Sequence, residues 1–417
     1  MTTIDGLEAH GIPVTAMAGG GVVETKTVVH DVDQLRSLLD TGLDQQGRQA
    51  HYQALFGGIA PAATGGATAT GGAATAGGAA TAGDDGGAAL SQRIAAHVVG
   101  NADLSDEDRA AIAPAFPLTA HVTAAPGPIT VTSRYDLSTP DGSLRIVSFS
   151  DVTLEQGGYF VCESTPLTFT CQTLTRNGNS GSSAADFNIL GKTGVTPATP
   201  PTPAAAGQAA PGAPGDCSSA GIAGPGGSPG NHGAAGTPGT AGVNGNPGTP
   251  SMQATITIQH TLTASQLTVY SQSGSGGTGG NGGAGGPGQQ GGNGGNGVTC
   301  DCTGNAGAPG GDGGPGGPGG PAGNGGNGVD AAGNVVIKVP GKPDVAKVHY
   351  TTAPALPGAA GQPGPGGPGG AGGSGGSGGK NNTGGGQGGS GAPGAAGARG
   401  AAGTVTGKAA QITVMAA

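Results

Sequence analysis

The sequence has few of the residues that build a large hydrophobic core. It has no Trp, and Phe and Tyr together make up 3% of its 417 residues. Because aromatic side chains supply much of the buried area in protein cores, a large globular enzyme is not expected. No apolar run approaches the roughly 20 residues of a membrane-spanning helix, so a membrane span is not expected either.

Charged residues are also scarce, at 9% of the chain, and the net charge is −9. Binding to nucleic acid depends on clustered Lys and Arg, so a nucleic-acid partner is not expected. The eight His residues are scattered, and there is no HExxH motif and no GxSxG motif between a strand and a helix. We therefore expect a non-enzymatic protein without cofactor or metal. The first residues show no basic stretch followed by an apolar one, so a Sec-type signal peptide is not expected.

Glycine is in large excess, with 96 Gly and 32 Pro. Such a composition indicates disorder when it is aperiodic and a threefold helix when Gly recurs every third residue. The second case applies here, because Gly occupies every third position of five segments, interrupted only at Ala322. The segments are 221–248, 276–297, 304–328, 358–379 and 385–403. This period predicts extended rods in which residues i and i+3 share one edge.

Some of these segments carry a second column of Gly, as in Gly279-Gly280-Asn281-Gly282-Gly283-Ala284. A collagen triple helix requires only one Gly column. Two bare edges suit a rod that packs against neighbouring rods, which then supply partners for its backbone N–H and C=O groups. The pattern resembles the polyglycine II bundles of certain phage tail-fibre adhesins and glycine-rich antifreeze proteins. The resemblance is limited to the repeat, and it implies a bundle of Gly-edged rods.

Breaks in the Gly phase predict hairpin tips. The phase shifts across 298–303, and turn-favouring residues interrupt it again at 380–384. We expect antiparallel hairpins with arms of roughly 60 to 80 Å, and we place 221–248, with one Gly column, at the periphery. The residues expected to be exposed at the tips are Asp301, Lys380, Asn381, Asn382 and Thr383.

Alternating β-branched and polar residues predict strands between the rods, within 254–271, 333–350 and 409–415. A denser series of short apolar runs over 128–190 predicts a β region, either a sandwich or a short solenoid. The expected fold class is mainly β plus polyglycine II, with rods in antiparallel hairpins inserted between strands. The last strand is expected to pair with another subunit through its free edge. It comprises Gln411, Ile412, Thr413, Val414 and Met415.

The remaining segments predict a small α-helical N-terminal region and two linkers. Residues 1–61 contain a helix that begins near Asp31, and 89–127 contain short helices, one of them with an approximate capping box from Ser105 to Asp108. The Ala/Thr/Gly-rich stretch 62–88 is expected to be a linker or a rod, and the Pro/Ala-rich stretch 191–220 is expected to be a linker.

Five cysteines are candidates for disulfides. Cys162 and Cys171 lie in neighbouring strand runs, whereas Cys217, Cys300 and Cys302 lie in or beside breaks of the Gly repeat. If those breaks are adjacent tips, we expect a disulfide from Cys217 to Cys300 or Cys302, and an odd cysteine could link subunits. Free thiols are the alternative. A disulfide would place the protein outside a reducing cytosol.

These features predict a structural protein that assembles into an extracellular fibre or surface appendage through rod packing and strand-edge pairing. The alternative is a receptor-binding adhesin, phage tail-fibre-like or on a cell surface, that uses the hairpin tips. A third hypothesis, ice binding, rests on Thr255-x-Thr257 and Thr261-x-Thr263. The expected partners are other copies of the chain and, for an adhesin, a cell-surface receptor or glycan. The expected location is extracellular, on the cell surface or on a virion.

Overall fold

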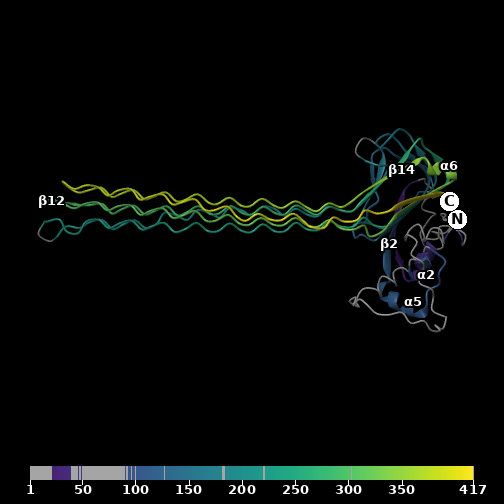
Figure 1. Cartoon of the computed structure of the whole chain (residues 1–417), viewed down its shortest axis with the longest axis horizontal. Coiled ribbons are helices and arrows are strands. Elements are labelled where there is room, and N and C mark those ends of the chain that lie inside the picture. Colours follow the sequence, from purple (N-terminus) through teal and green to yellow (C-terminus); the bar gives the residue numbers. More distant parts are fainter. Residues whose placement is uncertain are drawn as a thin grey trace, which may run out of the picture.

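A computed structural model describes two parts, a base of β-strands and a long stem that extends from it (Figure 1). The described residues are 21–38, 46, 48, 90, 93–94, 96–98, 100–125, 127–180, 184–218, 221–301 and 303–416. The stretch 62–88, expected to be a linker or a rod, lies outside them. Within these ranges, no helix is long and apolar enough to cross a bilayer.

The base contains two parallel sheets, and from β3 onwards the chain alternates between them. One sheet contains β3 (Ile129–Val131), β5 (Leu144–Leu154), β7 (Leu167–Arg176), β9 (Ala254–Thr263), β13 (Val335–Val339) and β15 (Ile412–Ala416). The other contains β4 (Arg134–Asp136), β6 (Tyr159–Glu163), β8 (Phe187–Leu190), β10 (Leu267–Gln272) and β14 (Val348–Ala353). Each coil therefore contributes one strand to each sheet. This arrangement is a β-solenoid, one of the two forms that the sequence left open. The protein is mainly β, as the sequence predicts.

The core of the base lies between the two sheets. The rings of Phe160 and Phe169 lie 5.0 and 5.1 Å from that of Phe187, measured between centroids, and all three side chains are fully buried. Aliphatic side chains from both sheets surround them. The scarce aromatic residues are thus concentrated where two sheets must be held apart, and the stem contains none.

The N-terminal side of the solenoid is extended by two strands that the sequence did not predict. β2 (Leu118–Ala125) pairs in parallel with β5, and β1 (Val23–Val29) pairs antiparallel with β2. The expectation of short helices throughout 89–127 is therefore wrong for β2, whose last six residues are buried against the edge of the solenoid.

Helices α2 (Val32–Leu38) and α5 (Asp106–Ile112) and the 3₁₀ turn η2 (Ala113–Ala115) complete this region. The side chain of Ser105 accepts a hydrogen bond from the backbone N–H of Asp108, as its spacing predicts for a helix N-cap.

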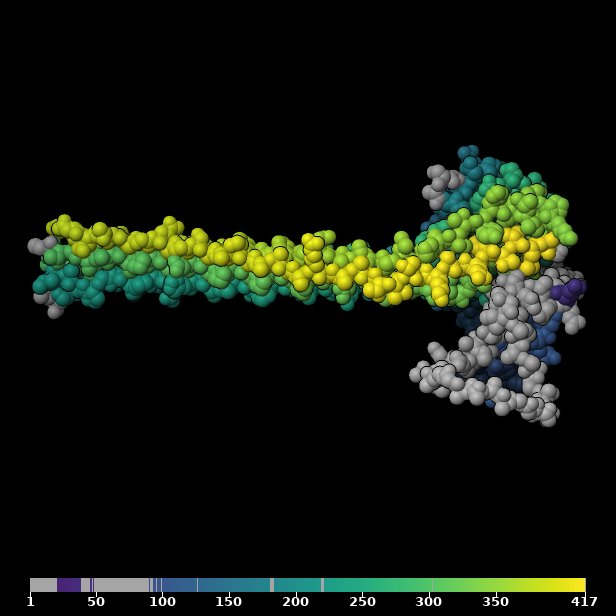
Figure 2. Space-filling model, viewed as in Figure 1, coloured from purple at the N-terminus to yellow at the C-terminus, as the bar shows by residue number. Residues whose placement is uncertain are grey.

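The stem consists of six extended arms that lie side by side (Figures 1 and 2). We call 191–216, 224–249, 273–298, 304–329, 355–379 and 384–407 arms 1 to 6. Successive arms run antiparallel in three hairpins. In arms 3 and 4, for example, Gly314 N donates to Gln289 O at 2.8 Å, and in arms 5 and 6 Gly391 N donates to Gly370 O at 2.8 Å.

Residues 191–216 form arm 1, so the expectation of a linker at 191–220 is wrong. The carbonyl groups of Val195 and Ala210 accept hydrogen bonds from Asn246 N and Asn231 N of arm 2. The Gly period of arm 1 is incomplete. Gly191, Gly194, Gly212 and Gly215 share one phase of three, but Pro and Ala occupy the positions of that phase between Gly194 and Gly212.

The arms form two layers that continue the two sheets of the base. Arms 1, 3 and 5 follow the adjacent strands β8, β10 and β14, whereas arms 2, 4 and 6 precede the adjacent strands β9, β13 and β15. Within each layer the arms are parallel: Gly279 N of arm 3 donates to Ala359 O of arm 5, and Gly239 N of arm 2 donates to Pro318 O of arm 4. Each hairpin is thus an excursion from one solenoid coil.

Glycine is required where two arms approach. A Cβ on Gly317 would lie 2.1 Å from Thr237 O, and one on Gly285 would lie 2.0 Å from Gly317 O. Neither contact leaves room for a side chain, and both obstacles are backbone atoms. Inner arms 3 and 4, which bond to arms on several sides, therefore carry two Gly columns.

The third column of residues in the inner arms faces outward. Its backbone N–H groups are either absent, where the residue is proline, or paired with an asparagine side chain of another arm. Pro315, Pro318 and Pro321 have no N–H. At Asn324, the N–H donates to Asn244 Oδ1 of arm 2, while its own Oδ1 accepts from Ala401 N of arm 6, both at 2.8 Å. Proline and asparagine recur in the Gly triplets because each satisfies this requirement.

Gly317→Ala tests the steric requirement. We expect the substitution to lower the free energy of unfolding by roughly 1–3 kcal/mol, because the added methyl group forces arms 2 and 4 apart. Gly386→Ala is the matched control, since no atom lies within 4 Å of the position of its Cβ. Chemical denaturation of both variants measures the difference. Equal stability of the two variants would contradict the close approach of the arms.

Lys338 is a buried base in β13, with 1% of its surface exposed. Burial lowers its pKa to about 7, whereas an unfolded lysine has a pKa of about 10.4. Between these values the unfolded chain binds a proton that the folded chain lacks, so the free energy of unfolding rises with pH across this window. We expect Lys338→Met to stabilise the protein most at pH 7 and below, and least near pH 10. Denaturation of both proteins across this range checks the prediction, and a pH-independent difference would refute it.

Candidate functional site

Three hairpin tips gather at the end of the stem that is remote from the base (Figure 1). They comprise 216–223, 298–303 and 380–383, and we call this surface the distal tip. Among its described residues, each tip contains one with a left-handed backbone: Gly221 (φ 66°), Asp301 (φ 31°) and Asn381 (φ 62°). Gly, Asp and Asn tolerate this conformation best, which explains the turn-favouring residues in the breaks of the repeat.

A disulfide joins the first two tips. It links Cys217 to Cys300, 83 residues apart in sequence. Cys302, the other partner considered for Cys217, lies outside the described residues.

Cys162 and Cys171 are free and buried, so their inclusion among the disulfide candidates is wrong. They lie on β6 and β7, which belong to different sheets. The Sγ of Cys162 donates a hydrogen bond to Thr165 O. Burial raises the pKa of Cys162 to about 12 and also raises the pKa of Cys171. Both thiols therefore remain protonated within the core.

Asn305 holds the first two tips together by hydrogen bonds. Its Nδ2 donates to Asp216 O at 3.0 Å and to Pro225 O at 2.8 Å, and its Oδ1 accepts from Val298 N at 2.7 Å. The residue is 7% exposed. The sequence analysis did not single out Asn305. Its position directly after the shift in Gly phase could have indicated a role at the tip.

The third tip is tied to the second. Lys380 N donates to Thr299 Oγ1 at 3.0 Å, and Asn382 Nδ2 donates to Gly304 O at 2.6 Å. Ala223 N of the first tip also donates to Thr303 Oγ1 of the second. The backbones of all three tips are therefore held in one arrangement.

The distal tip presents exposed polar side chains on the second and third tips and an exposed apolar side chain on the first tip. The residues predicted at exposed tips are all exposed there: Asp301, Lys380, Asn381, Asn382 and Thr383. Ile222, which sequence reasoning did not single out, is 60% exposed. An apolar side chain among polar ones on a fixed backbone can bind a partner by burying the apolar group and pairing the polar ones.

The strand proposed for subunit pairing lies at the opposite end of the molecule. Residues 412–416 form β15, the last strand of its sheet, which pairs with β13. β14 occupies the corresponding edge of the second sheet. Among the described strands, none covers the outer edge of either one.

The Thr pairs considered for ice binding lie on β9, in the middle of its sheet. Thr255 and Thr257 are 4% and 8% exposed. This first pair cannot contact ice, whereas Thr261 and Thr263 of the second pair are exposed. Ice binding through the second pair stays a prediction.

Asn305→Ala tests whether the tips are held together as described. We expect faster amide hydrogen exchange at Val298 and in 216–225, because the Val298 N–H loses its acceptor and the carbonyl groups of Asp216 and Pro225 each lose one of two donors. The unpaired N–H costs roughly 1–3 kcal/mol. Asn296→Ala is the control, since its exposed side chain accepts one hydrogen bond, from Ser377 N. Exchange in the tips that does not differ between the two variants would contradict this role.

The chain matches no protein-family model, no curated protein and no solved structure. Its function is therefore argued from geometry and chemistry.

Proposed function

We propose that this chain is a receptor-binding adhesin whose distal tip recognises a cell-surface protein or glycan, whose stem is a rigid spacer, and whose base attaches it to a larger structure. The observation that carries this proposal is the joining of three tips into one cross-linked surface at the end farthest from the base.

We infer that the six arms are polyglycine II helices. The Gly period of three, the donation of N–H groups by Gly of each arm, and the hydrogen bonds from one arm to several neighbours support this inference. A rod of this kind has no internal hydrogen bonds, so its stiffness depends on bundling. The two-layer arrangement of six arms provides that bundling and supports a role as spacer.

The chemistry of the distal tip supports recognition by direct contact. Ile222 on the first tip is the apolar anchor, Asp301 on the second tip supplies an anion, and Lys380 and Thr383 on the third tip supply a cation and a hydroxyl group. Because the disulfide and Asn305 order the backbone in advance, little conformational entropy is lost on binding. The disulfide also favours a location outside the reducing cytosol, on a cell surface or a virion.

The position of β14 and β15 favours assembly as a second function. Both are edge strands of the last solenoid coil, so a strand from another copy can add to the sheets there. Assembly through the base would leave the distal tip free. Fibre formation and adhesion are therefore compatible in one molecule.

The tip hypothesis is tested by binding of the labelled full-length chain to a panel of bacterial and eukaryotic cells. We expect binding to a subset of the panel and a loss of at least about tenfold in affinity, about 1.4 kcal/mol, for Ile222→Ser combined with Lys380→Ala. Gln362→Ala combined with Arg399→Ala is the control, because both residues are exposed on arms 5 and 6, 18 and 16 residues along the chain from the third tip. Binding that the tip variant retains, or an absence of binding to any cell, would reject the tip as the recognition surface.

A further inference from the structure

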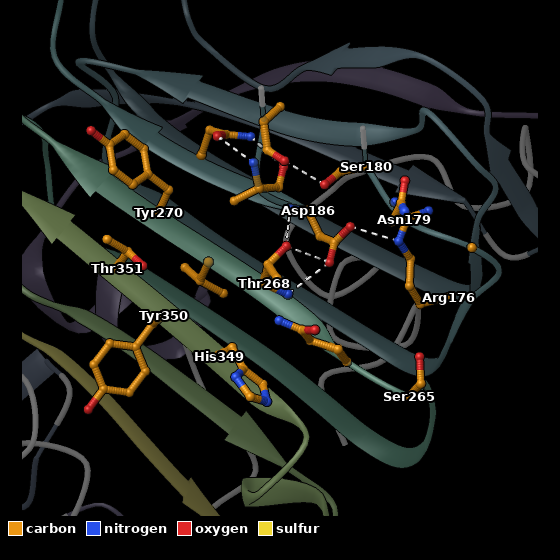
Figure 3. A pocket seen from close by; sticks show the side chains of 16 residues that line it. Arg176, Asn179, Ser180, Asp186, Ser265, Thr268, Tyr270, His349, Tyr350 and Thr351 are labelled. Carbon is orange, nitrogen blue, oxygen red and sulfur yellow. Dashed lines mark hydrogen bonds and ion pairs between the residues drawn. The ribbon is translucent and has the colours of Figure 1, made fainter. Parts of the chain in front are cut away.

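Each coil of the molecule repeats the positions of the coil before it. β14 pairs in parallel with β10, one coil earlier, and Figure 3 shows the two strands side by side. Arms 3 and 5, which follow them, keep an offset of 81 residues, as in the hydrogen bond from Gln362 N to Asn281 Oδ1. Arms 4 and 6 keep an offset of 77 residues, as in the bond from Ala401 N to Asn324 Oδ1. Each residue of arms 5 and 6 therefore has an equivalent in arm 3 or arm 4.

Arm 5 carries a column of backbone donors that point away from the bundle. In arm 3, the N–H groups of Gly285 and Gly288 donate to carbonyl oxygens of arm 5, both at 2.9 Å. Their equivalents in arm 5 are Gly366 and Gly369, whose N–H groups have no acceptor among the described residues. The same holds for Gly372, Gly375 and Gly378. These five donors, roughly 9 Å apart at about 3.1 Å per residue, face the position that a seventh arm would occupy.

Arm 6 offers acceptors to the same position. In arm 4, the carbonyl oxygen of Gly317 accepts from Gly367 N of arm 5 at 2.8 Å. The equivalent oxygen of arm 6 belongs to Gly394, and no described N–H donates to it or to the oxygen of Gly391. The edge formed by arms 5 and 6 thus presents the two groups that join the arms within one stem. A partner with the same groups at the same spacing is a second copy of this chain.

Side chains of arm 6 obstruct such a partner. In arm 4, Gly313 and Gly316 face arm 5, and a Cβ on either would lie 2.0 Å from a backbone oxygen of that arm. Their equivalents in arm 6 carry side chains, so an added arm would meet these side chains as closely. We call this set the blocking column, and five of its six equivalents in arm 4 are Gly. The blocking column comprises Gln387, Ser390, Pro393, Ala396, Arg399 and Ala402, all exposed.

The opposite edge of the stem ends in the same way. In arm 3, Gly277 and Gly292 face arm 1, and a Cβ on them would lie 2.4 and 2.0 Å from the oxygens of Val195 and Ala210. At the offset of 82 residues between arms 1 and 3, the equivalents of these two glycines are Val195 and Ala210 themselves. Val195 is 65% exposed. Both edges therefore carry side chains at positions where the interior of the stem carries glycine.

We propose that the blocking column limits the stem to six arms and prevents the stems of two copies from joining side by side. Without it, the free N–H and C=O groups of arms 5 and 6 would pair with those of a second copy, as unpaired groups at the edge of a sheet do. Arg399 adds charge repulsion, because a two-fold contact through this edge would place the guanidinium groups of both copies at the same level.

This role has a consequence for the assembly proposed through β14 and β15. Copies that meet there would keep separate stems, and each would present its own distal tip. The consequence rests on the proposed function, whereas the blocking column is tested on the stems alone.

The test removes the blocking side chains from the full chain. Ser390→Gly, Pro393→Gly, Ala396→Gly and Arg399→Gly are combined, and association is followed by analytical ultracentrifugation and negative-stain microscopy. The unaltered chain should show single stems, including where copies meet through their bases. The fourfold variant should show stems paired along their length, at a concentration at least about tenfold below any at which unaltered stems pair.

The matched control combines Ala392→Gly, Ala395→Gly, Ala398→Gly and Ala401→Gly. These residues are exposed equivalents of the outward column of arm 4, and their carbonyl groups already accept from arm 4. The control gains the same number of glycines on the same arm, so it should keep single stems.

If the fourfold variant does not fold, Pro393→Gly with Ala396→Gly alters less of arm 6 and decides the question. The proposal is overturned if unaltered stems pair through arms 5 and 6, or if the folded variants keep single stems. Neither result depends on binding to cells, so a failure here is distinguishable from a failure of the distal tip as a recognition surface.

Discussion

The structure of the stem depends on one contact, the approach of a glycine backbone to a carbonyl oxygen of the neighbouring arm. The hydrogen bonds across Gly317 and Gly320 measure 2.8 Å, and a Cβ at either residue would lie about 2 Å from a backbone oxygen. None of the hydrophobic clusters that the described residues form lies in the stem, so these bonds, each with a net contribution of roughly 0.5–1.5 kcal/mol, provide its cohesion. The composition of the chain follows from this contact: glycine where arms meet, and proline or asparagine where an N–H would otherwise remain unpaired.

The base determines which arms meet. In the solenoid, the two sheets are separated by Phe160, Phe169, Phe187 and their aliphatic neighbours, a spacing that is typically about 10 Å. The strands within each sheet are about 4.8 Å apart. As the strands continue into arms, the side chains between the layers give way to glycine and the two layers come into direct hydrogen-bonding contact. Successive coils thus fix both ends of each hairpin and set its register, as seen where Asn281 Oδ1 accepts from Gln362 N, 81 residues later.

Much of this architecture could be predicted, because a period of three and its phase breaks are local properties of the sequence. The Gly period and its breaks indicated the hairpins formed by arms 3 to 6. The alternation of β-branched and polar residues indicated most strands of the base. Arm 1 was missed, since Pro and Ala fill five consecutive positions of its Gly phase, from Pro197 to Ala209. β2 was missed because its burial depends on β5 rather than on its own pattern. Among the tip residues, Asp301 and Asn381 stand out as turn-formers, whereas the role of Asn305 depends on its contacts with 216–225.

The contact between a glycine backbone and a carbonyl oxygen of the neighbouring arm also prevents the arms from sliding past one another. If an inner arm slid by one residue, its outward column would replace a Gly column, and residues such as Pro318 or Asn324 would meet backbone atoms about 2 Å away. Slippage by three residues would preserve the Gly columns but would shift the tips by a full triplet and break the Cys217–Cys300 link. The stem therefore has one register and no side-chain core that could repack. It therefore fixes the distance between base and tip.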